Sequence, residues 1–394
     1  MRAGLIALVA AYVLSQFYRA FLAVLAPMLI SDLGVTAAEL STASGLWFAA
    51  FAAMQLPVGW ALDRIGPRRT AAGLFLICGT AGAALFTLAT GAVAVYAAMI
   101  LLGMACSPVL MAPYYICARV YPPAIFATIA SIIIGVGSLG NVAGSIPLAL
   151  VAEATGWRMT MAGLTAMTLI VGIALAILVR DPPATTEERA QKGSVLDLLK
   201  LPALWVIFPI MFVHYIPAAA LRGLWAGPYL FDVYGASATT IGWVTLAMSL
   251  AMVSGSLAIG PLDRLFGTRK WIILPGNAIA AVACFALYLS PSSGVVLSAV
   301  LLSAIGFFTM TYAVIIAHAR SFFPAHLTGR GVTLMNLFGI AGVGLAQVAT
   351  GRLYEATTAA ASDPALPYRV LFAVFGTLLL LGCLSYLFSR DRTD

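Results

Sequence analysis

The stretch GWALDRIGPRR (residues 59–69) decides the fold, because a second copy of it, GPLDRLFGTRK (residues 260–270), occurs in the other half of the chain. Two more blocks repeat in the same order. Asp32 is matched by Asp232, and CARVYPP (residues 117–123) is matched by HARSFFP (residues 318–324). Three blocks in register indicate two related halves, since self-similarity at a fixed offset is the signature of an internal repeat.

The composition excludes a water-soluble protein. Of 394 residues, 62% are hydrophobic and 9% are Asp, Glu, Lys or Arg, whereas soluble domains carry about 25% charged residues. Twelve long apolar runs predict twelve membrane-spanning helices, hence an all-α polytopic fold. The predicted spans are 4–30, 40–61, 70–90, 93–117, 124–152, 159–179, 203–230, 238–261, 271–290, 295–317, 330–351 and 367–388.

Basic residues predict the orientation. Of 21 Lys and Arg residues, only Arg158, Arg352 and Arg369 fall in odd-numbered connections, and only Arg19 and Arg222 fall within spans. The others lie in the termini or in even-numbered connections. Because positive charge is retained in the cytoplasm, both termini are predicted to be cytoplasmic. The net charge of +7 therefore reflects topology, and no nucleic-acid partner is expected.

The segment 181–202 divides the spans six and six. Its prolines and mixed charges are typical of a cytoplasmic linker. The predicted domains are an N-terminal six-helix bundle at 1–180 and a C-terminal six-helix bundle at 203–394. Repeats of this kind place a substrate site near the middle of the membrane, between the halves.

The block at 59–69 matches the GxxxDRxGxRR signature of the major facilitator superfamily at every fixed position, and the second copy matches it nearly as well. With its six-plus-six layout, the sequence resembles this superfamily over essentially its whole length. The resemblance implies the fold of that family and a secondary transporter working by alternating access, with no cofactor. It also implies a cytoplasmic latch, in which the loop aspartate caps a neighbouring helix and pairs with basic residues. The predicted gating residues are Asp63, Arg64, Arg68, Asp263 and Arg264.

Two arginines lie inside predicted spans, Arg19 in span 1 and Arg222 in span 7. A charged Arg near the bilayer centre costs at least about 2.5–3.5 kcal/mol, and none of the 14 acidic residues is predicted to lie mid-span. Spans 1 and 7 begin the two halves, so the two guanidiniums are predicted to clamp a carboxylate or phosphate between them. The alternative is that each Arg reaches toward the interface or bonds to carbonyls of a broken helix. Tyr12, Gln16 and Arg19 are spaced four and three residues apart, so they are predicted to share one helix face. Tyr215 and Arg222 are seven residues apart and are predicted to share a face of span 7, with Trp225 near it.

A narrower resemblance concerns the substrate. Span 1, with Arg19 eight residues before Pro27, is similar to the organophosphate/phosphate antiporters and the anion/cation symporters, in which the matching Arg contacts the anion. LWAGPYL (residues 224–230) resembles a W-x-P-x-Y-L stretch of the antiporters, although Arg222 sits about one turn closer to it. The Gly-rich span 5 resembles that of the nitrate/nitrite group, whose paired arginines lie on other helices. The Arg that many proton-linked members carry in span 4 has no counterpart here.

Other polar residues are secondary candidates for the site. His214 in span 7 would shuttle a proton or fill the core. Tyr114 in span 4 and Tyr312 in span 10 would line the cavity or pack, and Asn336 would face the cavity from span 11.

The sequence thus predicts a secondary active transporter of a small organic or phosphorylated anion, acting as an anion exchanger or a proton-linked symporter. One alternative is an exporter of drugs or metabolites. Another is an importer of Cu(I), suggested by the pair Met211 and His214, although 14 Met residues are expected filler in so apolar a chain. A membrane enzyme is not expected, because no paired acids or metal ligands lie at depth. The expected location is a bacterial inner membrane, and the expected state is a monomer.

Overall fold

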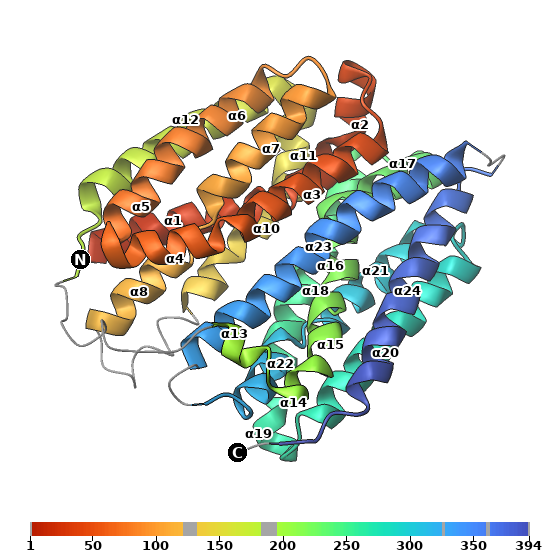
Figure 1. The fold of residues 1–394 in the computed structure, drawn as a ribbon. Helices are drawn as coiled ribbons and strands as arrows, with labels where there is room; N and C mark the ends of the chain where they lie inside the picture. The colour runs from red at the N-terminus through yellow and green to blue at the C-terminus, as the bar shows by residue number, and fades with distance from the viewer. Residues whose placement is uncertain (1, 121–131, 183–194, 325–327, 360–362, 393–394) are drawn as a thin grey trace. The chain divides into compact units, whose positions relative to one another are not determined.

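The computed structural model describes residues 2–120, 132–182, 195–324, 328–359 and 363–392. These residues form helices joined by short connections, and no strand occurs among them (Figure 1). Within this part of the chain, 11 helices are long and apolar enough to cross a membrane, and a bent pair makes up to 12. The predicted all-α polytopic fold is confirmed.

Each predicted span has a counterpart, and most bounds differ by only a few residues. The longest extension is in span 11, which runs on to Thr358. The observed spans are Ala3–Phe17 with Phe21–Leu33, Ala37–Leu62, Pro67–Thr87, Ala92–Cys117, Ile132–Thr155, Trp157–Leu178, Pro202–Tyr234, Ala238–Ile259, Lys270–Leu289, Val295–Arg320, Gly331–Thr358 and Leu366–Tyr386.

Contacts divide the chain into two compact units. Unit 1 takes up two short pieces of spans 7 and 8 in addition to the N-terminal spans, so it is larger than the predicted N-terminal bundle. The six-plus-six division stays a prediction. Unit 1 comprises Met1–Ala184, Gly223–Pro228 and Ala236–Leu246, and unit 2 comprises Thr185–Arg222, Tyr229–Gly235 and Ala247–Asp394.

In unit 1, α3 packs against α7, α12 packs against α5 and α6, and α1 packs against α10 and α12. A π-helical turn, η1, interrupts span 3. The elements are α1 Arg2–Phe17, α2 Phe21–Leu33, α3 Ala37–Ala53, α4 Gln55–Arg64, α5 Pro67–Leu74, η1 Phe75–Gly79, α6 Thr80–Thr87, α7 Ala92–Cys106, α8 Met111–Val120, α10 Leu139–Ala143, α11 Ile146–Thr155 and α12 Trp157–Leu178.

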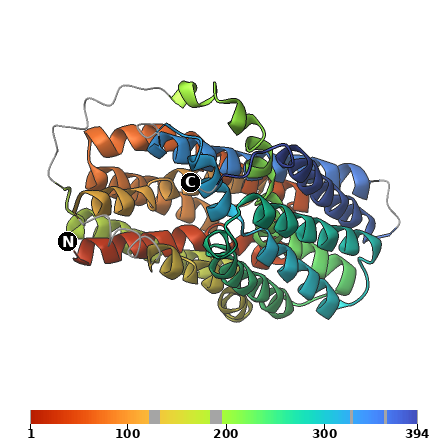
Figure 2. The ribbon, with the colours of Figure 1, turned by 90° about the horizontal axis from the view of Figure 1, so that it is seen from below.

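In unit 2, α20 packs against α21 and α24, and α15 packs against α23 and α24. Span 7 is assembled from several short pieces, while α23 is a single long helix (Figure 2). The elements from α13 onward, of which η3, α17 and α18 lie partly in unit 1, are α13 Val195–Leu198, α14 Pro202–Trp205, α15 Phe208–Val213, α16 Ile216–Ala220, η3 Leu221–Trp225, α17 Ala226–Tyr234, α18 Ala238–Ile259, α19 Leu262–Phe266, α20 Lys270–Leu289, α21 Val295–Phe308, α22 Tyr312–Arg320, α23 Thr328–Thr358 and α24 Leu366–Tyr386.

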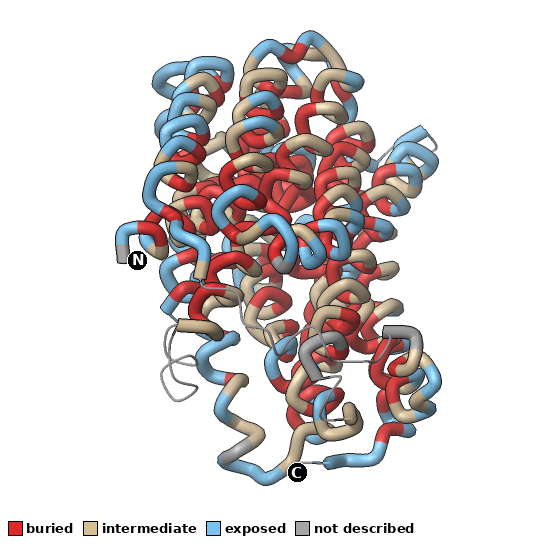
Figure 3. The backbone as a smooth tube through the Cα atoms, turned by 60° about the vertical axis from the view of Figure 1, so that its left-hand side comes forward, coloured by how far each residue is buried: buried red, intermediate tan, exposed pale blue. Residues whose placement is uncertain are grey.

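Burial follows the helix faces. In each unit the buried positions lie where helices meet, and exposed positions recur along the outer faces (Figure 3). Many exposed side chains are large and apolar, among them Trp60, Trp243 and Leu257. Contiguous apolar surface of this kind is rare on soluble proteins, and in an integral membrane protein it contacts lipid.

The repeated aspartates Asp32 and Asp232 have similar structural roles. Asp32, at the end of α2, accepts a hydrogen bond from Trp157 Nε1 (2.9 Å) and pairs with Arg158 (3.4 Å) at the start of α12. Asp232, near the end of α17, accepts a hydrogen bond from the Tyr368 hydroxyl on α24. Each carboxylate therefore ties the first span of one half to the last span of the same half.

A carboxylate also caps span 3 at the motif end of unit 1, meaning the end that carries residues 59–69. Asp181, which follows α12, accepts a hydrogen bond from Arg68 N (2.7 Å) at the start of α5. Gly66 has φ of 97°, and a Cβ there would lie only 2.8 Å from the Asp181 carboxyl carbon. Glycine is thus required both for the left-handed backbone and for the close approach of the carboxylate.

The motif end of unit 2, which carries residues 260–270, is built in the same way. Asp391, which follows α24, accepts hydrogen bonds from Arg269 N (3.1 Å), Lys270 N (3.0 Å) and the Thr268 hydroxyl. Burial alone would raise the pKa of Asp391, but these hydrogen bonds outweigh it and hold the pKa below its ordinary value. The ionised carboxylate also offsets the positive end of the α20 dipole.

Candidate functional site

Arg19 lies at a break in span 1. Helix α1 ends at Phe17, α2 begins at Phe21, and the two helices are bent by 49°. In the turn, Arg19 N donates to Gln16 O (3.3 Å) and Ala20 N donates to Phe17 O (2.9 Å). These bonds reach back three residues instead of four, as in a tightened 3₁₀ turn. The expectation that span 1 is one continuous helix through Arg19 is therefore wrong.

Aromatic side chains hold this break in place. The Tyr18 hydroxyl shares a hydrogen bond with Thr168 Oγ1 (2.8 Å) on α12. The Phe21 ring packs edge-on against Tyr18 (5.9 Å between centroids) and against Phe86 on α6 (5.2 Å). Irregular backbone at membrane depth is tolerated where protein surrounds it or where it lines a cavity, and this packing supplies the surrounding protein.

Two aromatic rings lie beside the Arg19 guanidinium. Its guanidinium carbon lies 4.9 Å from the Phe51 ring centre and 5.1 Å from that of Trp47. Cation–π contacts of this kind are worth about 0.5–2 kcal/mol, more when water is excluded. Within the described part of the chain, no carboxylate pairs with Arg19.

Two hydrogen-bond donors, one on Arg19 and one on Trp47, have no acceptor among the described residues. Arg19 Nε and Trp47 Nε1 are both buried, and neither has a hydrogen-bond partner among the described residues. Guanidinium and indole N–H groups only donate, and a buried donor left unpaired costs about 1–3 kcal/mol. The arrangement therefore favours a ligand that brings acceptor oxygens.

Trp47 and Phe51 were not predicted as site residues. They lie four residues apart on α3, which places both on one face of the helix, and their rings stack at 5.3 Å. Gly103 on α7 allows α3 to come close, because a Cβ there would lie 2.3 Å from Trp47 O. Their spacing was the available signal, but an aromatic pair in an apolar span is more often packing than a binding element.

The other residues predicted around Arg19 are on α1. Tyr12 is buried, and its ring packs against Gly137, where a Cβ would lie 2.2 Å from the ring. Gln16 is half-buried in the last turn of α1. Because the helix ends at Phe17, the helical spacing that placed Arg19 on the face of these two residues does not hold. Their contact with substrate stays a prediction, as does that of the half-buried Tyr114 on α8.

Arg222 is only 2% exposed and lies in the π-helical turn η3. Such turns are rare and often occur at functional sites. Tyr215 lies in the break between α15 and α16, and the π turn changes the register beyond it. The prediction that Tyr215 and Arg222 share a helical face is therefore wrong in its geometry. Trp225, the last residue of η3, is fully buried.

Four predicted residues come together in unit 2. The His214 ring stacks on Tyr312 (6.1 Å between centroids) and lies beside Tyr215 (6.2 Å). The Tyr312 hydroxyl donates to Asn336 Oδ1 on α23 (3.1 Å). Spans 7, 10 and 11 thus contribute to one polar cluster.

The tautomer of neutral His214 follows from its hydrogen bond. His214 Nδ1 lies 2.9 Å from Met211 O, and because a carbonyl only accepts, Nδ1 must carry a hydrogen. Nε2 then holds the lone pair, and it is buried without a partner among the described residues. His214 can therefore accept a hydrogen bond or a proton at Nε2.

The predicted gating residues are only partly described. Asp263 pairs with Arg269 (3.5 Å), and both side chains are 15% exposed. Arg68 Nε donates to Ala176 O (2.7 Å), and Arg64 is exposed at the end of α4. The side chains of Asp63 and Arg264 lie outside the described part of the structure, so their roles stay predictions.

The acidic residues of the described chain lie in the first or last turn of a helix or in a connection. None lies in the middle of a spanning helix. The site region therefore presents basic and neutral donors without a described carboxylate.

Comparison with known proteins assigns the fold and the family. The sequence model of the Major Facilitator Superfamily matches residues 8–225 and 207–394. A comparison with curated proteins found no match.

Several solved structures are similar along nearly their whole length. One is a bacterial homolog to the human lysosomal transporter Spinster, in an inward-facing and occupied conformation: 20% identity, 98% of this chain and 96% of that chain covered, TM-score 0.77. A D-xylose-proton symporter matches with 14% identity, 100% and 98% coverage and a TM-score of 0.80. The nucleoside transporter NupG matches with 17% identity, 98% and 99% coverage and a TM-score of 0.74. At such identities the likeness shows the fold.

Proposed function

We propose that this chain carries small organic anions such as carboxylates or phosphate esters. The chain belongs to the Major Facilitator Superfamily and is an integral membrane transporter rather than an enzyme. The observation that carries the proposal is the setting of Arg19, a cation beside two stacked aromatic rings at a helix break, with no described carboxylate as its partner. An anion would satisfy both the charge and the buried donors of Arg19 and Trp47.

Arg222 is proposed as the second cationic contact. It stands in the first span of the second half, as Arg19 does in the first half, and in both places the regular helix is interrupted. Discontinuous spanning helices commonly form the substrate sites of secondary transporters.

Anion exchange is the proposed mode of transport. Among the described residues no carboxylate lies at mid-span to carry a proton, and an exchanger always returns with its arginines occupied. Symport with a proton is the second candidate, favoured by the buried lone pair of His214 Nε2. We further propose a monomer in a bacterial inner membrane, with both termini in the cytoplasm.

Thermal unfolding of the purified protein tests the substrate class. Carboxylates and phosphate monoesters should raise the unfolding temperature, whereas D-xylose and tetraphenylphosphonium should not. A ligand present at 100 times its Kd stabilises by about 2.7 kcal/mol. Arg19→Gln should abolish the shift, and Arg352→Gln, which removes an exposed arginine of α23, should retain it. Stabilisation by anions that survives in both Arg19→Gln and Arg222→Gln would refute the anion site.

Transport in proteoliposomes separates the two modes. Exchange predicts that uptake of a labelled anion requires unlabelled anion inside and is unaffected by a proton gradient. Stimulation by an inward proton gradient that is lost in His214→Gln would establish symport instead.

A further inference from the structure

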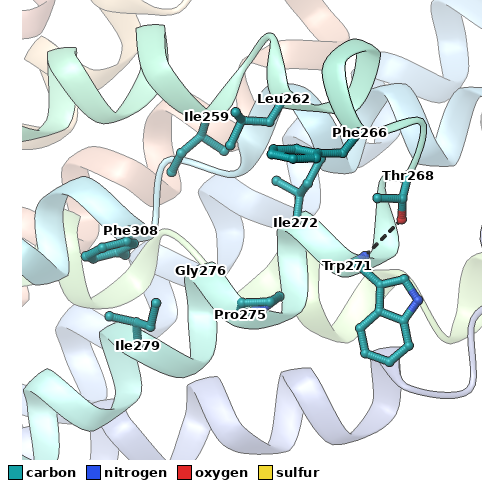
Figure 4. A pocket seen from close by; sticks show the side chains of 10 residues that line it. All are labelled: Ile259, Leu262, Phe266, Thr268, Trp271, Ile272, Pro275, Gly276, Ile279 and Phe308. Atoms are coloured by element: carbon teal, nitrogen blue, oxygen red, sulfur yellow. Dashed lines mark hydrogen bonds between the residues drawn. The ribbon is translucent and has the colours of Figure 1, made fainter.

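Each unit has an apolar groove at its motif end. The first groove, of about 400 Å³, lies along α4 and α5, and Trp60, Ile65, Gly73 and Ile77 are among its lining residues. The second groove, of about 490 Å³, lies beside α19 and α20, and its lining includes Trp271 (Figure 4). Both volumes fall in the range of small-molecule sites.

Both grooves open on lipid-facing surface. Trp60 is 61% exposed and Ile77 is 72% exposed in the first groove, and Trp271 is 61% exposed in the second. Tryptophan is enriched at the membrane–water interface. The apolar part of each groove can therefore take an acyl chain, and its tryptophan marks the level of the lipid head groups.

The two grooves differ in charge. Arg69 lines the first groove and is exposed, and among the described residues no carboxylate pairs with it. Lys270 holds the same position in the second copy of the repeated motif, but its ammonium group donates to Leu387 O (2.6 Å) and Ser389 O (2.9 Å). No charged residue is among the described residues that line the second groove.

We propose that the first groove is a binding site for an anionic phospholipid of the adjoining leaflet. The acyl chain lies along Trp60, Ile65 and Ile77, and the phosphate pairs with Arg69. Guanidinium binds phosphate oxygens through paired donors, and basic pockets beside spanning helices bind anionic head groups. The second groove accepts acyl chains without preference for the head group, because no described lining residue is charged and the nearby Lys270 already donates to backbone carbonyl groups.

Two variants remove the two halves of this site separately. Arg69→Gln removes the charge that binds the phosphate. Gly73→Leu fills the groove from within: a Cβ at Gly73 meets no atom within 4 Å, so the new side chain would occupy the groove without disturbing the fold. The matched controls are Lys270→Gln, at the repeat-related position, and Gly163→Leu, at another helical glycine of unit 1 with equally open space.

Native mass spectrometry of the purified protein with phosphatidylglycerol and phosphatidylcholine of identical chains provides the measurement. The unaltered protein should retain phosphatidylglycerol in preference, by about tenfold for a contact worth 1.4 kcal/mol. Arg69→Gln should lose the preference, and Gly73→Leu should lose the bound lipid of either kind at this site. Both controls should behave as the unaltered protein.

Three results would overturn the proposal. One is equal retention of the two lipids by the unaltered protein. Another is a preference that persists in Arg69→Gln. The third is an equal loss in Lys270→Gln, which would indicate general attraction to a basic face instead of one groove.

Discussion

Aromatic rings, in place of a carboxylate, offset the free-energy cost of holding the Arg19 charge within the membrane. The faces of Trp47 and Phe51 lie beside its guanidinium and leave hydrogen-bond donors unused. A carboxylate would have neutralised the site and excluded anions, whereas aromatic faces stabilise the cation and keep its charge for a ligand.

Replacing Trp47 tests this arrangement at the level of one atom pair. Trp47→Phe keeps an aromatic face but removes the indole N–H, so the Kd for a bound anion should rise by about tenfold, as for a lost hydrogen bond to a charged group. Calorimetric titration with the anion found by thermal shift measures it. Trp243→Phe, at a lipid-facing position, should leave the Kd unchanged. Unaltered affinity in Trp47→Phe would place the N–H outside the substrate contact.

At this scale the sequence predicted the charge but not its surroundings. Arg19 stands out because an ionised side chain in an apolar run requires an explanation. Trp47 and Phe51 do not stand out, because hydropathy indicates that a side chain is apolar and not which neighbouring side chain it contacts. The packing of the Tyr12 ring on Gly137 was likewise not predicted.

At the scale of secondary-structure elements, the informative features are the interrupted helices and the helix caps. The lengths of the spans were predictable, since apolar length is set by the thickness of the membrane. The break at Arg19 and the π turn at Arg222 were not, because such irregularities depend on tertiary contacts such as that of Tyr18 with Thr168. Likewise, Asp181 was not predicted as the cap of α5.

Asp391 should stabilise the start of α20. Asp391→Ala removes the acceptor of three hydrogen bonds and should cost about 0.5–2 kcal/mol of unfolding free energy, as for other helix caps. Thermal unfolding in detergent measures the loss. Asp197→Ala removes an exposed carboxylate that pairs with Lys200, and this control should change stability by less than about 1 kcal/mol.

The lowered pKa of Asp391 also predicts a dependence on pH. A carboxyl group whose pKa is lower in the folded state contributes stability above its ordinary pKa of 3.8, and this contribution is lost as the pH falls through the lower folded value. The stability difference between the unaltered protein and Asp391→Asn should therefore be largest near neutral pH and shrink below pH 3.8. A difference that grows on acidification would contradict this cap.

Gly103 should be intolerant of any side chain. Gly103→Ala would place a Cβ 2.3 Å from Trp47 O, so α3 and α7 must separate. Overpacking of this kind costs about 1–3 kcal/mol, and displacement of Trp47 should weaken anion binding as well. Gly163→Ala, in open space on α12, should leave both the unfolding temperature and the anion Kd close to those of the unaltered protein.

At the scale of the whole molecule, the repeat organises the chain. Asp32 and Asp232, and likewise Asp181 and Asp391, perform matching tasks in the two units. The first pair was recognised from sequence because it sits in matched blocks. The second pair, each in an Arg-Asp dipeptide after the last span of its half, was missed because it lies outside those blocks.

The positive-inside rule makes a prediction about both termini. Fluorescent protein fused to residue 394 should fluoresce, and alkaline phosphatase fused there should be inactive, because both depend on the compartment that receives the C-terminus. Phosphatase fused after Arg158, in an odd-numbered connection, should be active. Activity of phosphatase at the C-terminus would reverse the predicted orientation.

The bend at Arg19 also divides span 1 into two helical segments. Its segments, Arg2–Phe17 and Phe21–Leu33, are linked by a turn with no regular ladder of helical hydrogen bonds. A force on the guanidinium would therefore act on this turn, which the contacts of Tyr18 with Thr168 and of Phe21 with Phe86 hold against the rest of unit 1. Deuterium uptake should be fastest at the amides of this turn and should slow when an anion binds. The exchange rate at the turn would then report whether the site is occupied.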